Sequence, residues 1–584
     1  MNKNKQHLQT RVSPIWVVLF LCGLNLLFMH FYIFLTCHLD AELDFSFFVD
    51  NFIGVCFDVI IVFFISYWLS LRKIKLALSI CFFVTWIWSL SSVMYSRFFF
   101  HYLSLSAVWQ GMALGDDLII QCIKAKLHVI DLFYPSVAVL FVILLKKIQF
   151  DTSILIWKRI VIRFFFILFC DLGIHAVYCI SNPKLRYFSY YTHRLYSNHF
   201  VGHLNYSAPI LAHFLRGEVR TLFEEIRMNL LDNVDLSEQQ ISEINNRIAR
   251  GTEFVSDSIN TKSNTNVIFI LVESYMSFTS DLKIGGKDIT PFLNSLKRDP
   301  SVYYNGRMKT NVTIGGSSDG QFIYMTGLLP LRSVLTLSKA RHATLPGLPQ
   351  MLNMRSRMII PTVTSIWDQD QMCRQYGFDE LYARDDFYKD IERNLTDEEV
   401  FQLAMQKDKE SKQPFFSIVL TITMHQPYVE QIDSSFLIKD NSITDELANY
   451  LNACHYTDMQ IEKYIGWLKE SGMYDKSLIV IAADHPVDNT DFGGVNDDIP
   501  LYILNAGVNP ENMWHGECNQ VDVYNTLLDL LKCKSAWRGL GCSLMHPNYE
   551  NTISPQTWEV SEWIIYGNYF SKNDVLGKHL ISPK

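Results

Sequence analysis

The sequence lacks several features that mark common functional classes. Its 584 residues carry a net charge of only -8 and no polybasic tract, which argues against nucleic acid as a partner. No two of its twelve cysteines have C-x-x-C spacing, so they indicate neither a zinc ribbon nor a redox pair. Seven of them lie in or beside apolar segments, where cysteine serves as a small hydrophobic residue, and a disulfide between Cys533 and Cys542 stays open.

The first third of the chain is strongly apolar. Five runs are long enough to cross a bilayer as helices: 13–36, 47–71, 75–97, 128–146 and 159–180. No A-x-A-like site follows the first run and four more runs come after it, so we do not expect a cleaved signal peptide. A transporter is an alternative for such a bundle, but the absence of a detectable repeat and the long polar remainder favour an anchor and substrate platform.

Charged residues between the runs predict their orientation. Basic residues precede the first run and fill the second and fourth connections: Lys3, Lys5, Arg11, Arg72, Lys73, Lys75, Lys146, Lys147, Lys158 and Arg159. The connection after the first run is acidic instead, so the N-terminus is expected in the cytoplasm and everything after residue 181 outside. Segment 98–127 is expected to lie at the outer bilayer surface. Asp58 and Asp171 lie within runs, where carboxylates are often functional, but capping or pairing inside the bundle explains them about as well, so neither is assigned a role.

Three further segments follow the five-span domain 1–181. Residues 182–260 mix polar and aromatic residues and are expected to form a juxtamembrane linker with helices at 217–230 and 237–250, with a plain solvated linker as the alternative. Residues 261–545 form the predicted external domain, and 546–584 a C-terminal extension.

The predicted external domain alternates apolar strands with helices. The expected strands are 267–272, 358–363, 415–422, 478–483 and 500–504, and the expected helices are 291–297, 318–328, 398–406, 445–470 and 521–531. Strands that are apolar on both faces and separated by helices indicate an α/β fold with a mainly parallel sheet, covered by helices on both faces. In such a fold, ligands bind beyond the carboxyl ends of the strands.

Residues with metal-binding side chains fall at these strand ends. Glu273 follows the first strand, and Asp484 and His485 follow the fourth. A G-G-S-S-D stretch opens a helix, with Ser317 as candidate nucleophile and Ser318 as the better helix cap. Two carboxylates, an imidazole and the Ser317 hydroxyl would hold one divalent ion, Zn²⁺ or Mn²⁺, with Mg²⁺ left open. Taken singly, each residue also has an ordinary explanation as a cap or surface group.

Four stretches around these residues resemble the lipoteichoic acid synthase and phosphoglycerol transferase branch of the alkaline phosphatase and sulfatase superfamily. They are V-E-S at 272–274 followed by G-G-K-D-I-T-P-F-L-N at 285–294, G-G-S-S-D at 315–319, M-H-Q-P-Y at 424–428, and the long stretch from 455 to the D-H pair at 484–485. The resemblance covers nearly the whole chain. Phosphoethanolamine transferases share the architecture but are less similar in these stretches.

The resemblance implies a bacterial inner-membrane enzyme whose sulfatase-like domain is periplasmic or extracellular. It implies that His425 and Trp367 bind substrate, and that Ser317, where the family has Thr, carries a covalent intermediate. The implied reaction moves a phosphoglycerol or phosphoethanolamine headgroup from a phospholipid to an envelope glycan or glycolipid. The family's W-N-R segment reads Trp367-Asp368-Gln369 here, so the guanidinium that helps to hold phosphoglycerol is missing and the headgroup stays open.

Two other functions remain as alternatives. A sulfatase-like hydrolase of phosphodiesters or sulfate esters would share the first half-reaction, but a formylglycine sulfatase is disfavoured. Counting from Ser317, Asp319 stands where its [CS]-x-P-x-R signature needs Pro, and Gln321 where it needs Arg. A non-catalytic membrane-anchored binding protein is disfavoured because all four candidate metal ligands are present.

Overall fold

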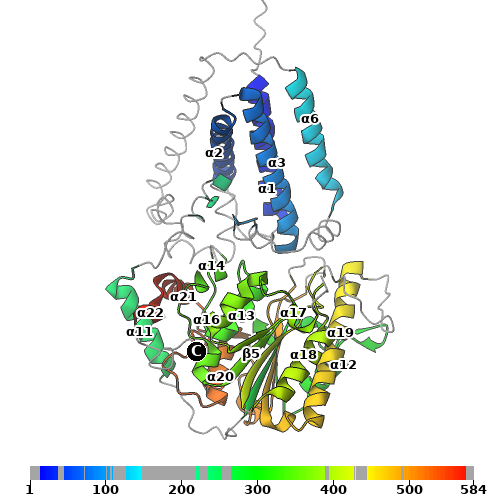
Figure 1. The fold of residues 1–584 in the computed structure, drawn as a ribbon, viewed down its shortest axis with the longest axis vertical. Coiled ribbons are helices and arrows are strands. Elements are labelled where there is room, and N and C mark those ends of the chain that lie inside the picture. Colours follow the sequence, from blue (N-terminus) through cyan, green and yellow to red (C-terminus); the bar gives the residue numbers. More distant parts are fainter. Residues whose placement is uncertain are drawn as a thin grey trace, which may run out of the picture. The chain divides into compact units, whose positions relative to one another are not determined.

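The structure is a computed structural model (Figure 1). It describes residues 14–36, 45–71, 73–99, 102–105, 108, 127–147, 217–219, 221–222, 226, 235–252, 265–332, 335–388, 393–412, 414–426, 428, 443–487, 492 and 495–573. The chain divides into two compact units, one of Met1–Val108 with Asp116–Met228 and one of Trp109–Gly115 with Asn229–Lys584.

The first unit contains long apolar helices: α1 (Pro14–Thr36), α2 (Phe45–Leu69), α3 (Ile74–Phe99) and α6 (Phe133–Lys147), the last preceded by the short η1 (Val129–Leu132). Among the described residues, four stretches are long and apolar enough to cross a membrane: Ile15–Thr36, Asn51–Leu69, Ile74–Arg97 and Val129–Lys146. They agree with the first four predicted runs. The predicted span 159–180, Asp171 within it, and most of segment 98–127 lie outside the described residues.

Asp58 of α2, which received no role from the sequence, is a helix cap inside this unit. Its carboxylate accepts the backbone N–H groups of Glu218 at 2.6 Å and Val219 at 2.9 Å. The indole of Trp88 donates to the Glu218 carboxylate at 2.7 Å. Gly217 has φ 84°, and a Cβ there would lie 2.3 Å from Asp58 Oδ2. Only glycine therefore allows this carboxylate to approach the helix start so closely.

Replacing Gly217 with alanine should lower the melting temperature of the purified protein in detergent. The added Cβ would overlap the Asp58 carboxylate, and the left-handed backbone alone costs about 1–2 kcal/mol for a residue with a side chain. Gly23→Ala is the matched control, because a Cβ on α1 at that position meets Val55 and Val59 at an ordinary 3.7 and 3.8 Å. Equal melting temperatures for the two variants would contradict the capping assignment.

The second unit is built on an eight-stranded sheet with the order β10-β4-β9-β8-β1-β7-β5-β6. The strands are β1 (Asn266–Val272), β4 (Tyr303–Lys309), β5 (Arg355–Ile359), β6 (Glu380–Tyr382), β7 (Phe415–Leu420), β8 (Ser477–Ala483), β9 (Ile499–Leu504) and β10 (Cys518–Asn519). Strand β9 runs antiparallel to its neighbours β8 and β4, whereas the other pairs are parallel. The predicted mainly parallel sheet is confirmed.

Four of the predicted strands are present close to their expected bounds, as β1, β7, β8 and β9, whereas the strand predicted at 358–363 is β5, which begins three residues and ends four residues earlier. The sequence did not predict β4, β6 and β10, or the small β2 (Lys283–Ile284) and β3 (Lys287–Asp288) hairpin. Strand β4 alternates buried and partly exposed residues and carries Asn305, Arg307 and Lys309, while β6 and β10 are only three and two residues long. Such strands lack the continuous apolar run on which the prediction relied.

Helices cover both faces of the sheet (Figure 1). One face carries α12 (Pro291–Arg298), α18 (Asp397–Glu410) and α19 (Asp445–Glu470), and the other carries α13 (Ser317–Thr326), α16 (Gln369–Tyr376) and α20 (Asp522–Leu530). Shorter helices are η5 (Ser277–Thr279), α14 (Leu337–Ala340), α15 (Leu348–Leu352), η6 (Ile366–Asp368), α17 (Arg384–Phe387), η8 (Tyr474–Lys476), η10 (Pro510–Asn512) and α22 (Tyr569–Lys572). The five predicted helices of this domain are confirmed.

Helix α11 (Glu238–Thr252), from the predicted linker, packs on α21 (Pro555–Gly567) and α22 from the predicted C-terminal extension. The Tyr569 hydroxyl donates to Asn245 Oδ1 at 2.5 Å, and a Cβ at Gly567 would lie 2.7 Å from Leu236. The guanidinium of Arg332 forms two buried hydrogen bonds with Glu562, at 2.9 and 3.0 Å. These contacts tie α11, α21 and α22 to the same compact unit as the sheet.

Candidate active site

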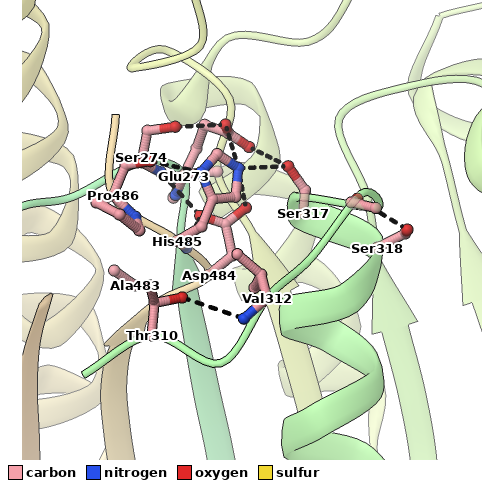
Figure 2. A network of polar contacts seen from close by, with 12 residues as sticks. Glu273, Ser274, Thr310, Val312, Ser317, Ser318, Ala483, Asp484, His485 and Pro486 are labelled. Atoms are coloured by element: carbon pink, nitrogen blue, oxygen red, sulfur yellow. Dashed lines mark hydrogen bonds and ion pairs between the residues drawn. The ribbon is translucent and has the colours of Figure 1, made fainter. Parts of the chain in front are cut away.

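Two neighbouring parallel strands bring the candidate carboxylates together. Val272 at the end of β1 is paired with Ala483 at the end of β8, so Glu273 and Asp484 leave the sheet side by side. Both side chains are buried. The hydroxyl of Thr421, which follows β7, accepts the backbone N–H of Glu273 at 3.0 Å. The predicted gathering of these side chains at the carboxyl edge therefore has a direct cause in the strand order (Figure 2).

Helix α13 delivers Ser317 to the same place. The preceding Gly316 has φ 47°, a conformation suited to glycine, and α13 starts directly after it. Gly320 lies against the end of β8, where a Cβ would come within 2.5 Å of the Asp484 carbonyl oxygen. This close approach puts Ser317 Oγ 3.2 Å from Glu273 Oε2 and 3.1 Å from His485 Nε2 (Figure 2).

The imidazole of His485 is oriented by its own loop. Its Nδ1 lies 2.7 Å from the carbonyl oxygen of Pro486, an acceptor, so Nδ1 carries the proton and Nε2 is the atom that could bind a metal. His485 Nε2 lies 3.6 Å from Glu273 Oε1 and 3.6 Å from Asp484 Oδ2. Pro486 thus fixes the imidazole tautomer through its carbonyl group.

The electrostatics of the site favour a cation. Burial raises the pKa of Asp484 to about 7, and the neighbouring charge of Glu273 acts in the same direction. The ligand atoms of Glu273, Asp484 and His485 all lie within 4.8 Å of one another. A tetrahedral ion with bonds of about 2.1 Å would separate its ligands by about 3.4 Å, close to the 3.1–3.6 Å distances around His485 Nε2. The residues therefore fit a divalent metal.

His425 lies near this cluster, after β7. Its Nδ1 is 2.6 Å from the carbonyl oxygen of Gln426. The imidazole is exposed to solvent although many protein atoms surround it. The desolvation that these atoms cause lowers the pKa of His425, and the charge of His485 adds to the effect.

Trp367 is connected to the site through the helix that carries Ser317. It and Asp368 have φ of 55° and 47°, an uncommon conformation for two successive residues with side chains. Asp368 is paired with Arg341 at 2.9 Å. The next residue, Gln369, donates to Gln321 of α13 at 3.0 Å, one turn beyond Ser317. In the described part of the chain, the indole itself makes no hydrogen bond or ring contact with the candidate metal ligands.

The prediction that Ser318 caps α13 is wrong. The helix begins one residue earlier, and the Ser318 hydroxyl donates to the carbonyl oxygen of Gly315 at 2.9 Å instead of accepting an N–H group. Asp319 is instead the acceptor for the backbone of this loop. Its Oδ2 accepts the N–H groups of Thr313 at 3.0 Å and Gly315 at 3.0 Å. The Gly315-Gly316 turn brings those N–H groups within reach of the Asp319 carboxylate. They are therefore not available as donors to the Ser318 hydroxyl.

Asp319→Ala should lower the stability of the external domain. Removing the carboxylate leaves buried N–H groups of the nucleophile loop without an acceptor, at about 1–3 kcal/mol for each such group. Burial raises the pKa of Asp319, so Asp319→Asn, which retains an acceptor oxygen, is the matched control and should lose much less. Chemical denaturation would measure both, and an alanine variant as stable as the wild type would refute this role.

Two further buried side chains support the site and were not recognised from the sequence. Asp397 at the start of α18 accepts the N–H groups of Ile422 at 2.8 Å and Thr423 at 3.1 Å, in the loop that leads to His425. Gln520 donates to the Asp484 carbonyl oxygen at 2.7 Å. Both act across more than 20 residues of sequence, and no local pattern around either residue signals such a contact.

Known proteins resemble this chain in sequence. The sulfatase family model matches residues 265–533. Lipoteichoic acid synthase 2 of Bacillus subtilis is 26% identical over 475 residues, which cover 76% of this chain and 69% of that protein. A lipoteichoic acid synthase of Staphylococcus aureus is 27% identical over 295 residues, 45% of each chain. The latter match thus spans less than half the length of the relative.

A solved structure extends the similarity of fold to both units. The integral membrane lipooligosaccharide phosphoethanolamine transferase A from Neisseria meningitidis has a TM-score of 0.55, with 14% identity, and the match covers 89% of this chain and 95% of that one. Residues 265–533 therefore form a sulfatase-family domain, and the chain as a whole is similar to lipoteichoic acid synthases and shares the fold of an integral membrane phosphoethanolamine transferase.

Proposed function

We propose that this protein is a metal-dependent transferase that moves a phospholipid headgroup, through a phospho-Ser317 intermediate, to an envelope glycan or glycolipid. The observation that carries the proposal is the position of Ser317 Oγ, at the start of a helix and 3.2 and 3.1 Å from atoms of Glu273 and His485. A nucleophile placed among such ligands suits attack on a phosphodiester. The similarity to lipoteichoic acid synthases supports the same reaction class.

Glu273, Asp484, His485 and Ser317 would hold one divalent ion, Mn²⁺ or Zn²⁺ with Mg²⁺ also open. When bound, the ion would lower the pKa of the serine hydroxyl and offset negative charge on the phosphoryl oxygens.

Ser317 Oγ then attacks phosphorus, the bond from phosphorus to the diacylglycerol oxygen breaks, and diacylglycerol leaves with a proton. In the second half, the acceptor hydroxyl loses its proton and attacks the same phosphorus, and Ser317 Oγ departs and takes up a proton.

His425 and Trp367 are the proposed contacts to the headgroup. The exposed imidazole of His425 can orient the phosphodiester or protonate the departing oxygen. The half-buried indole of Trp367 lies in a segment held to α13 through Gln369 and Gln321. Gln369 supplies an amide where the family has arginine, so both phosphoglycerol and phosphoethanolamine stay candidates for the headgroup.

Purified full-length protein in detergent with Mn²⁺ provides the test. Phosphatidylglycerol and phosphatidylethanolamine would be supplied separately, and diacylglycerol release and headgroup-phosphate on the protein measured by mass spectrometry. Adduct formation with either lipid supports the proposal. Release of free headgroup phosphate without transfer to an added glycolipid would favour the hydrolase alternative, and cleavage of an aryl sulfate without lipid cleavage would refute the proposal.

The donor must also reach the site, so the domain that carries Ser317 should lie outside the cytoplasm. A protease added to intact spheroplasts should release a fragment that begins between about residues 182 and 260, because the basic connections predict this orientation. A cytoplasmic protein serves as the control for cell integrity. Full protection of the domain would overturn both the orientation and the choice of donor.

A further inference from the structure

Ser274 is not one of the candidate ligands, yet it contacts two of them. Its hydroxyl donates to Glu273 Oε1 at 2.8 Å, and its backbone N–H donates to Asp484 Oδ1 at 2.8 Å. Figure 2 shows Ser274 on the opposite side of Glu273 from Ser317. One residue therefore holds one oxygen of each carboxylate, although the two carboxylates follow different strands.

The backbone of Ser274 accounts for this double contact. Its φ is 48°, in the left-handed region that residues with side chains seldom adopt. An extended residue would carry the chain onward along β1. The left-handed turn instead directs the N–H group toward Asp484 after β8 while the side chain reaches back to Glu273.

A third contact fixes the turn. The buried Tyr450 hydroxyl, from α19, donates to the Ser274 carbonyl oxygen at 2.9 Å and accepts the N–H of Met276 at 3.1 Å. An unfavourable backbone conformation persists where its surroundings determine it, and such positions cluster at functional sites. The hydrogen bonds around Ser274 thus hold an uncommon turn at the edge of the site.

The contacts leave the other carboxylate oxygens facing the site. Glu273 Oε2 lies 3.2 Å from Ser317 Oγ, and Asp484 Oδ2 lies 3.6 Å from His485 Nε2. Asp484 Oδ1 also accepts the backbone N–H of His485 at 2.8 Å, so that oxygen is occupied twice. Ser274 thus holds one oxygen of each carboxylate, and the held oxygen of Glu273, Oε1, still lies 3.6 Å from His485 Nε2.

We propose that Ser274 is a positioning residue of the metal site: its hydroxyl orients Glu273 and its backbone N–H orients Asp484. Metal affinity then depends on a residue that is not itself a ligand, as is common for groups that hold metal-binding side chains in place. The inference rests on the proposed function in one respect, namely that Glu273 and Asp484 bind the ion.

Ser274→Gly tests the hydroxyl alone, because glycine keeps the N–H group and readily adopts a φ of 48°. Isothermal titration of Mn²⁺ and of Zn²⁺ into metal-free full-length protein in detergent should show a dissociation constant raised about 10-fold or more. Ser274→Ala should show a similar loss. Ser277→Ala, in the same turn region, is the control and should bind as the wild type does, since its hydroxyl is not hydrogen-bonded to either carboxylate in the described structure.

A second measurement separates positioning from folding. The melting temperature of metal-free Ser274→Gly should equal or exceed that of the wild type, because glycine relieves the left-handed backbone. Wild-type metal affinity in both Ser274→Gly and Ser274→Ala would overturn the inference. If Asp484→Ala loses the metal while the Ser274 variants keep it, the inference alone fails. If Asp484→Ala also keeps it, the proposed metal site fails as well.

Discussion

Ser317→Ala is expected to abolish headgroup transfer, with a loss of turnover of at least about 10³-fold that is typical of a removed nucleophile. Ser317 Oγ lies among the atoms of Glu273 and His485, and the alanine methyl group can neither attack phosphorus nor bind a metal. Intact-mass analysis after incubation with phospholipid should show a headgroup-phosphate adduct on the wild type and none on Ser317→Ala.

Ser318→Ala is the matched control, one residue further along α13. Its hydroxyl donates to the Gly315 carbonyl oxygen, so its loss should cost about 1 kcal/mol of stability and leave much of the turnover. Ser317→Thr should retain part of the activity, because a secondary hydroxyl can still attack phosphorus. An adduct on Ser318, or an active Ser317→Ala protein, would overturn the assignment of the nucleophile.

Loss of any one of Glu273, Asp484 and His485 should remove metal and activity together. Each replacement by alanine deletes one ligand and leaves the remaining buried charges uncompensated, so we expect metal affinity to fall by at least about 100-fold. Metal content after dialysis would be measured by mass spectrometry alongside lipid turnover. The two readouts should decline in parallel across the three variants.

Asp281→Ala is the control for this series. Its carboxylate is also paired, with Lys297 at 2.7 Å and Arg298 at 2.6 Å, but it is exposed and outside the cluster. Exposed ion pairs contribute little to stability, so metal content and turnover should both stay at the wild-type level. An Asp484→Ala protein with full metal and full turnover would place the metal site elsewhere.

The local pattern of the sequence predicted the elements that are long and continuously apolar. Strands β1, β7, β8 and β9 are buried along their whole length, which is why their runs were recognisable, and α19 matched its predicted bounds. The edge strands β6 and β10, and β4 next to β10, were missed because they are short or mixed in character. The functional side chains at the ends of the recognisable strands were therefore predictable from the sequence, whereas the shorter strands at the sides of the sheet were not.

By itself, the sequence determined the residue types of the site and their positions at the ends of β1, β8 and the Gly315-Gly316 turn. Only the tertiary structure decided that β1 and β8 are neighbours, that Ser318 bonds to a carbonyl group, and that Ser274 turns back onto two carboxylates. The reason is physical. Apolar periodicity depends on neighbours along the chain. Strand order and the left-handed backbone of Ser274 depend instead on long-range contacts, such as those that Tyr450 and Asp484 make with Ser274 across more than 170 residues.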